Sequence, residues 1–596
     1  MKGEIVMKYS CNPVNFGYRY QFNRQQDGSI AVSREAADPS MILFKGRYYI
    51  YPSMTCGFLY SDDMVQWKLH PLVDMPVYDY APDVRVKGEY LYFCASNHEK
   101  GTYYRTKDPF SEVYERIDGA FPFWDPNLFV DDDGRIYFFW GSSTTEPLYG
   151  IELDAETMQP VGERQNLVYV DASVKGFERT GEDHIPERTQ EEKDMLLQGM
   201  AASSIPASVR KAAEDFILGL PYVEGVWVNK HGGKYYLQYG TPGSRFNIYG
   251  DAVYISEKPL GPYRLADNNP YSYKPGGFLP GAGHGSTMED RYGNAWHVST
   301  MRICVNHNFE RRIGIWPAGW DEDGELFCNQ RYGDWPYAVE EGKTDPWKKP
   351  EWMLLSYGKQ AKASSYVEGK EPDKAADENV RTWWRAADSQ SGQWLEVDLG
   401  NIYDVRAIQV NFADDALETE LPERAVMEGA LHQERWIDEI PQKTCWKLEG
   451  SLDGKSYFMI EDKSHADTDL PHDLVVREMG VKMRYIRLTV ICLPYGQTAC
   501  VSGLRVFGLG DGPLPEQTEK VTVKRDGDLD ILVSWQGNAL GYVVEWGHRP
   551  DKLYHSRQVF GDNVHIGGLV KGQDVYIRVD SFNENGITEG EIIREA

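Results

Sequence analysis

One hairpin pattern recurs five times in the first half of this 596-residue chain, and it constrains the fold more than any other feature. Each copy has a short apolar strand, a turn that contains glycine, and an aromatic strand. The copies are DPSMILFKGRYYI (38–50), APDVRVKGEYLY (81–92), DPNLFVDDDGRIYF (125–138), EGVWVNKHGGKYYL (224–237) and HGSTMEDRYGNAWH (284–297). A hairpin repeated about every forty residues is typical of a β-propeller. The sequence therefore predicts five blades around a central axis.

Three copies begin with an acid, namely Asp38, Asp125 and Glu224, and a fourth begins with His284. If the same position of each innermost strand faces the axis, these four side chains converge on one pocket. A single acid there is more typical of a turn that binds backbone amides. Three converging carboxylates lose hydration and repel one another, so they add no stability. They can instead separate into a protonated acid and an ionised base, as glycoside hydrolysis requires.

Taken together, the five copies resemble the blades of glycoside hydrolase family 43 over roughly residues 12 to 335. The resemblance implies an enzyme that inverts configuration. It assigns Asp38 as the general base that activates water, Glu224 as the general acid, and Asp125 as the third acid that orients and tunes the donor. An inverting pair stands roughly 6.5–9.5 Å apart so that a water fits between the carboxyl groups.

The resemblance also implies that His284 helps to hold a central calcium ion through water. Calcium prefers oxygen ligands, so such an ion would be surrounded mostly by water. The alternative is a histidine that is bonded to the substrate or to a carboxylate, with no metal. In the closing segment FERRIGIWPAGWDEDGEL (309–326), family members carry an arginine that reaches the sugar, and we select Arg312 over Arg311.

Two aromatic residues depart from the family pattern and leave the substrate open. Trp124 precedes Asp125 where an aliphatic residue is usual, and Tyr80 stands where tryptophan is common. Aromatic faces stack on sugar rings, so both are candidate substrate contacts, although plain packing is the alternative.

Charge and composition narrow the class of substrate. The net charge of −28 disfavours polyanions such as nucleic acid and favours neutral oligosaccharides. No apolar stretch is long enough to cross a membrane. The first ten residues lack the apolar core of a signal peptide, and the eight cysteines are widely spaced. We therefore expect a cytoplasmic enzyme, or a secreted one if the sequence has been trimmed.

We expect an all-β chain with three domains. A five-bladed propeller at 12–340 would carry a helical insertion at about 171–220, made of two short helices with a break at 204–206. This insertion either forms a wall of the pocket or lies on the outer rim of the propeller. Residues 355–510 resemble a discoidin or coagulation-factor type C jelly roll, similar to carbohydrate-binding module family 32. Residues 515–596 resemble a fibronectin type III sandwich. Sugar binding by the jelly roll stays open, and the C-terminal domains are candidates for contacts between copies of the chain.

These expectations combine into one function. We expect an exo-acting inverting glycosidase that releases a terminal α-L-arabinofuranosyl or β-D-xylosyl unit from neutral oligosaccharides. An exo-β-galactosidase is the enzymatic alternative, and a carbohydrate-binding protein that has lost catalysis is the alternative of another class.

Overall fold

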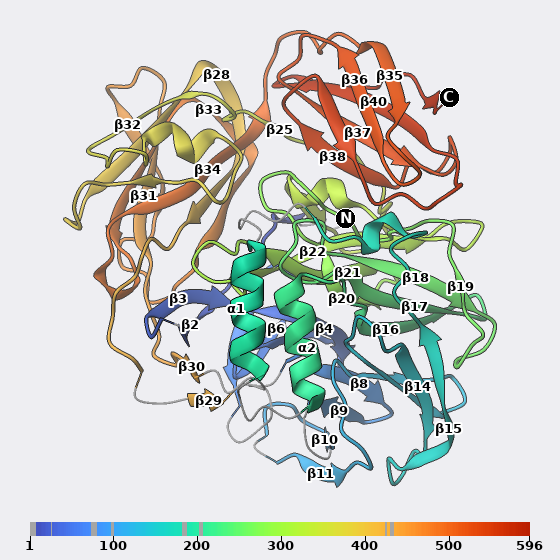
Figure 1. Cartoon of the computed structure of the whole chain (residues 1–596). Helices are drawn as coiled ribbons and strands as arrows, with labels where there is room; N and C mark the ends of the chain where they lie inside the picture. The colour runs from blue at the N-terminus through green and yellow to red at the C-terminus, as the bar shows by residue number, and fades with distance from the viewer. Residues whose placement is uncertain are drawn as a thin grey trace, which may run out of the picture.

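The computed structural model describes residues 7–25, 27–72, 80–96, 101–111, 113–181, 188–201, 207–422, 426–428 and 434–595. Five four-stranded antiparallel sheets form the first half of the chain (Figure 1). Their strands are β4 Ala37–Phe44, β5 Arg47–Ser53, β6 Gly57–Ser61 and β7 Lys68–Pro71; β8 Asp83–Lys87, β9 Tyr90–Cys94, β10 Thr102–Thr106 and β11 Glu115–Asp118; β12 Asn127–Val130, β13 Ile136–Trp140, β14 Leu148–Leu153 and β15 Pro160–Val168; β16 Glu224–His231, β17 Lys234–Thr241, β18 Gly250–Ser256 and β19 Arg264–Leu265; β20 Gly283–Glu289, β21 Ala295–Arg302, β22 Arg311–Trp320 and β23 Leu326–Cys328.

The first strands of these sheets, β4, β8, β12, β16 and β20, contact one another in a closed ring. A closed ring of sheets is the five-bladed propeller that the repeat predicts. The second strands of the first four hairpins are rich in buried aromatic residues, which pack between neighbouring sheets. Strand β1 Lys8–Ser10 pairs with β24 Tyr337–Val339, so the two ends of the propeller segment lie side by side.

The helical insertion lies between the third and fourth blades. It contains the 3-10 helix η1 Gly176–Glu178 and the helices α1 Gln190–Ala201 and α2 Ala207–Leu218. The predicted break at 204–206 lies outside the described residues. Helix α1 has no buried residue, whereas Ala213 and Ile217 of α2 are buried. Neither of these twelve-residue helices is long and apolar enough to span a membrane, and the same holds for every helix in the described ranges.

Two further β units follow the propeller. An eight-stranded sheet with its own apolar core contains β25 Met353–Leu354, β26 Gln360–Ala363, β27 Trp384–Arg385, β28 Gln393–Phe412, β31 Cys445–Ser451, β32 Tyr457–Asp462, β33 His472–Cys492 and β34 Cys500–Leu509. The last unit has two sheets, one of β35 Glu519–Arg525, β36 Ile531–Gln536 and β39 Asn563–Ile566, the other of β37 Gly541–Gly547, β38 His555–Val559, β40 Tyr576–Asn583, β41 Gly586–Thr588 and β42 Ile593–Arg594. The 3-10 helices η2 Gln330–Gly333, η3 Pro372–Ala376 and η4 Pro494–Gly496 complete the described elements. The all-β prediction is thus confirmed.

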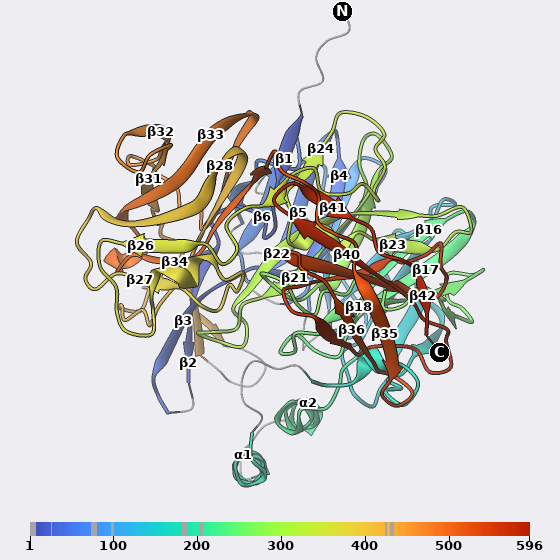
Figure 2. The same ribbon diagram turned by 90° about the horizontal axis from the view of Figure 1, so that it is seen from above.

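Both C-terminal units pack against the propeller (Figure 2). Phe246, Ile248 and Tyr273 of the propeller share a core with the last unit. The second unit makes a less expected contact, because the strands β29 Val426–Glu428 and β30 Glu434–Ile437 extend the hairpin of β2 Arg19–Arg24 and β3 Ile30–Glu35. A segment from the second unit thereby completes a sheet that begins before the first blade.

Candidate active site

The first residues of the blades share an unusual backbone conformation. Asp38, Ala81, Asp125 and His284 have φ values of 47°, 52°, 50° and 47°. In the fourth blade the equivalent residue is Gly225, with a φ of 59°. A positive φ is strained for residues other than glycine, and such strain concentrates at functional sites. The repeat therefore turns one residue of each blade out of the strand at the same place.

Glu224 does not share this phase, so that part of the prediction is wrong. Strand β16 pairs Glu224 with Gly240 just before an irregularity, as β4 pairs Ala37 with Ser53. Glu224 thus matches Ala37 and stands one position before the residue that corresponds to Asp38.

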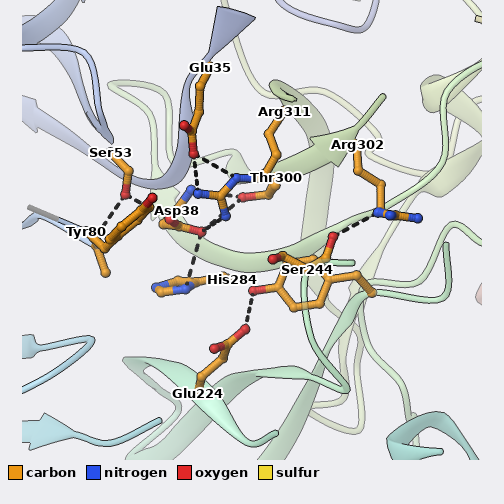
Figure 3. A network of polar contacts seen from close by, with 12 residues as sticks. Glu35, Asp38, Ser53, Tyr80, Glu224, Ser244, His284, Thr300, Arg302 and Arg311 are labelled. Atoms are coloured by element: carbon orange, nitrogen blue, oxygen red, sulfur yellow. Dashed lines mark hydrogen bonds and ion pairs between the residues drawn. The ribbon is translucent and has the colours of Figure 1, made fainter. Parts of the chain in front are cut away.

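The packing of His284 explains the shift. A Cβ atom at Gly225 would lie 2.4 Å from the imidazole ring of His284, so no side chain fits there. The residue before the glycine supplies the acid instead, and Glu224 still faces the same centre (Figure 3).

The Asp38 carboxylate is buried and held by charged and hydroxyl donors. Ser53 donates to Oδ2 at 2.8 Å, Arg311 Nη1 donates to Oδ1 at 3.0 Å, and His284 Nδ1 lies 3.5 Å from Oδ1. Burial opposes ionisation, but the charges of Arg311 and His284 outweigh it and hold the pKa of Asp38 below its usual range. Asp38 is therefore an ionised carboxylate, as a general base must be.

Glu224 lies in a different environment, in which hydroxyl groups are its hydrogen-bond donors. Its carboxyl oxygens accept hydrogen bonds from the hydroxyls of Tyr249 at 2.9 Å and Ser142 at 3.1 Å. Loss of hydration raises the pKa of Glu224, and the negative charge of Asp38 adds to this effect, although His284 opposes it. Glu224 is therefore disposed to keep its proton, as a general acid must.

Asp125 stands with the other two acids. The pKa of Asp125 is raised to about 8, foremost by burial and also by the charges of Glu224 and Asp38, which together outweigh the opposing effect of His284. Ser96 Oγ lies 3.5 Å from Oδ1 and accepts from the Asp125 amide at 2.9 Å. The three acids thus influence one another electrostatically, which is the convergence that the sequence predicts.

His284 lies between these carboxylates. Its Nδ1 is 3.5 Å from Asp38 and 3.9 Å from Asp125. Burial lowers the pKa of His284, but the nearby carboxylates overcome this and raise it. The described residues contain no group of three or more His, Cys, Asp or Glu side chains that could hold a metal ion. The distances to Asp38 and Asp125 fit an imidazolium paired with carboxylates. A calcium ion held mostly through water, as the resemblance implies, needs no such group and stays a prediction.

The arginine next to the site is Arg311, and the choice of Arg312 is wrong. Arg312 donates from Nε to His472 Nε2 at 2.9 Å and from Nη1 to the Arg34 carbonyl at 3.0 Å. Both arginines belong to β22, and successive residues of a strand point to opposite faces. Arg311 consequently faces Asp38, while Arg312 faces the second unit.

The two predicted aromatic contacts form a half-buried wall beside the acids. The ring centroid of Tyr80 lies 6.2 Å from that of Trp124 and 5.7 Å from that of Phe309. Tyr80 also lies beside Ser53 and Asp38 (Figure 3). Tyr80 and Trp124 thus lie together near the acids and stay candidate substrate contacts, and Phe309 adds a third aromatic residue that the sequence analysis missed.

A cavity of about 130 Å³ opens beside Glu224, and Phe309 of the aromatic wall lines it as well. Gly219 and Leu220, just beyond helix α2, line it, as do Arg245 and Phe246. The C-terminal end of the insertion therefore reaches the pocket, which favours the walling role over decoration of the rim. Arg302 holds this neighbourhood by donating to the Ser244 carbonyl at 2.8 Å (Figure 3).

Sequence reasoning also missed the polar partners of the acids. Ser53, Ser142 and Tyr249 are common residue types in strands and loops, and no spacing marks them. Glu35 is different, since an acid three residues before Asp38 in SREAADP stands next to the first blade. It is fully buried and accepts from Arg311 at 2.6 Å.

Comparison with known proteins agrees with this geometry. The model of glycosyl hydrolases family 43 matches residues 30–189 and 186–326, and that of the F5/8 type C domain matches residues 360–444. Xylosidase/arabinosidase 43A of Humicola insolens is 26% identical over 279 residues, which cover 38% of this chain and 77% of the relative. A β-xylosidase of Xylanibacter ruminicola is 22% identical over 266 residues, with the same two coverages of 38% and 77%.

Solved structures resemble this chain at low sequence identity. The GH43 BlXynB protein of Bacillus licheniformis aligns with a TM-score of 0.40 at 15% identity, covering 84% of this chain and 98% of the other. An α-L-arabinofuranosidase of Clostridium thermocellum aligns with a TM-score of 0.32 at 17% identity, covering 49% of this chain and 93% of the other.

Proposed function

Because residues 30–326 make this chain a member of glycosyl hydrolase family 43, and hence a glycoside hydrolase, we propose that it is an exo-acting enzyme that inverts configuration. Asp38 activates a water molecule, Glu224 protonates the leaving oxygen, and Asp125 assists Glu224. The proposal includes the carboxyl separation of roughly 6.5–9.5 Å that this reaction course needs.

One observation carries the proposal: the pKa values of two carboxyl groups in one pocket are shifted in opposite directions. Arg311 stabilises the ionised form of Asp38, whereas desolvation stabilises the protonated form of Glu224. A base must be ionised and an acid protonated at the same pH, and only groups with separated pKa values meet both conditions. A binding protein without catalysis has no need of this separation.

We further propose that the sugar removed is a terminal pentose, α-L-arabinofuranosyl or β-D-xylosyl. The two relatives described above, a xylosidase/arabinosidase and a β-xylosidase, support this class of substrate. The sugar ring lies against Tyr80 and Trp124 on the Asp38 side. The remainder of the oligosaccharide leaves on the Glu224 side, where the cavity beside Leu220 and Arg245 receives it.

A panel of nitrophenyl glycosides tests this function with the wild type and the Glu224→Gln variant. We expect turnover of the arabinofuranoside or the xyloside, with an initial product of inverted anomeric configuration by NMR. Turnover of the β-galactoside alone would favour the other exo-activity, and binding without turnover of any glycoside would favour a carbohydrate-binding protein. A product of retained configuration would contradict the inverting roles.

A further inference from the structure

Arg435 comes from the second β unit but lies at the candidate active site of the propeller. Strand β30 pairs with β2, and this pairing sets Arg435 opposite Asn23. The guanidinium lies 5.6 Å from the ring of Tyr80 and 5.8 Å from that of Phe309, and its Nη1 donates to the Tyr80 hydroxyl. Arg435 is only 7% exposed. A segment about 400 residues from the first blade thus supports the aromatic wall of the pocket.

Glu35 connects Arg435 to the proposed base. The Oε2 atom of Glu35 forms an ion pair with Arg435. Its Oε1 atom accepts from Nε and Nη2 of Arg311 at 3.1 and 2.6 Å. The remaining nitrogen of Arg311, Nη1, lies 3.0 Å from Asp38. The four groups therefore form a buried row of alternating charge, and Figure 3 shows the part from Glu35 through Arg311 to Asp38.

We propose that Arg435 is a positioning residue of the active site, which neutralises Glu35 and so leaves Arg311 available to Asp38. This inference rests on the proposed role of Asp38 as the base. A buried carboxylate requires a compensating charge, and removal of one partner leaves the other charge uncompensated. Two carboxylates and two guanidinium groups are balanced. Without Arg435, Glu35 and Asp38 compete for the single guanidinium of Arg311.

A separate set of ion pairs, made by Arg34, joins the second unit to the propeller segment. Arg34 precedes Glu35 in β3 and points to the opposite face. It pairs with Asp414 at 3.0 Å and with Asp469 at 2.9 Å, both in the second unit. Arg34 thus joins the two units away from the pocket, whereas Glu35 and Arg435 are directed toward it.

A double-mutant cycle on the full chain tests the proposal, with the nitrophenyl glycoside that the wild type hydrolyses best. Arg435→Met should lower kcat about tenfold, because Glu35 then draws Arg311 away from Asp38. KM should rise by a smaller factor, because Tyr80 loses the hydrogen bond from Arg435. Glu35→Gln should also lower kcat. The double variant should be no slower than the slower single variant, since removal of both partners leaves no uncompensated charge.

Two controls separate positioning from docking. Arg435→Lys keeps the charge and should recover most of kcat. Glu439→Gln breaks an ion pair of 3.1 Å with Arg19 of β2, two residues beyond the end of β30, and should leave both constants unchanged. Circular dichroism on each variant verifies that the chain is folded.

Several results would overturn the inference. These are multiplying losses in the double variant, an unchanged kcat in Arg435→Met, a loss confined to KM, or an equal loss in Glu439→Gln. The Asp38→Asn variant separates failure of the role proposed for Arg435 from failure of the proposed base. If that variant is inactive and the cycle shows no coupling, only the role of Arg435 fails. If Asp38→Asn stays active, the base assignment fails and the role of Arg435 fails with it.

Discussion

The two sides of the pocket use the same chemical group in opposite ways. On one side, Asp38 is surrounded by Arg311, His284 and Ser53, and the positive charges keep it ionised. On the other, Glu224 accepts hydrogen bonds from the hydroxyls of Tyr249 and Ser142, next to a cavity bordered by the insertion. The comparison shows that the neighbouring residues set the pKa of each carboxyl group, and hence which group acts as base and which as acid.

The largest effect should come from the charged side. Asp38→Asn removes the group that activates water, so kcat should fall at least about a thousandfold for every leaving group. Rates on nitrophenyl and unactivated glycosides measure this directly. A loss of kcat that depends on the leaving group would instead indicate that Asp38 is the acid and Glu224 the base.

Glu224→Gln should produce the complementary pattern. An unactivated oligosaccharide needs a protonated leaving oxygen, so its hydrolysis should slow about a thousandfold, whereas a nitrophenyl glycoside should lose about tenfold or less. The comparison of the two substrates under identical conditions is the measurement. Equal losses on both would show that Glu224 does not donate the proton.

Arg311→Met should change the pH dependence on the acidic side. Because Arg311 is the foremost group that stabilises ionised Asp38 against burial, its removal raises the pKa of that carboxyl. Activity is lost as the pH falls through the pKa of the base, so the acidic limb of kcat/KM should move to higher pH, with a loss of about tenfold at the optimum. Arg312→Met, one residue away but facing His472, is the matched control and should leave the limb in place.

The sequence predicts the repeated parts of this molecule better than its particular contacts. The period of the hairpins identifies the blades, and Asp38 and Asp125 share the same backbone conformation. The position of Glu224 depends on the space that His284 occupies against Gly225. The glycine at the position equivalent to Asp38 is the one sign of this shift in the sequence.

Other contacts lay beyond sequence reasoning because they depend on strand phase or on distant segments. Whether Arg311 or Arg312 faces the axis is decided by the strand alternation of β22, which two adjacent arginines do not reveal. Arg435 reaches the pocket because β30 pairs with β2. No local sequence pattern predicts a pairing between segments so far apart in the chain.

A smaller effect should appear where the insertion borders the acid side. Leu220→Ser changes the lining of the cavity beside Glu224 but leaves the carboxyl groups in place. We expect KM for an unactivated oligosaccharide to rise about threefold to tenfold, with little change for a nitrophenyl pentoside that does not fill the cavity. Met195→Ser, at an exposed position of helix α1, is the control within the same insertion. Equal behaviour of the two substrates would show that the cavity does not receive the leaving group.

The smallest effect should come from removal of metal. His284 is the residue that the family resemblance links to calcium, yet its Nδ1 faces Asp38 and Asp125, and the carboxylates raise its pKa. An imidazolium holds two carboxylates together without a metal and is itself a poor ligand, because ligation requires the neutral ring. Protein treated with a chelator and shown by elemental analysis to be free of metal should therefore keep its full activity and its pH dependence. Loss of activity that calcium restores would instead establish an ion at the centre of the propeller, as the sequence first suggested.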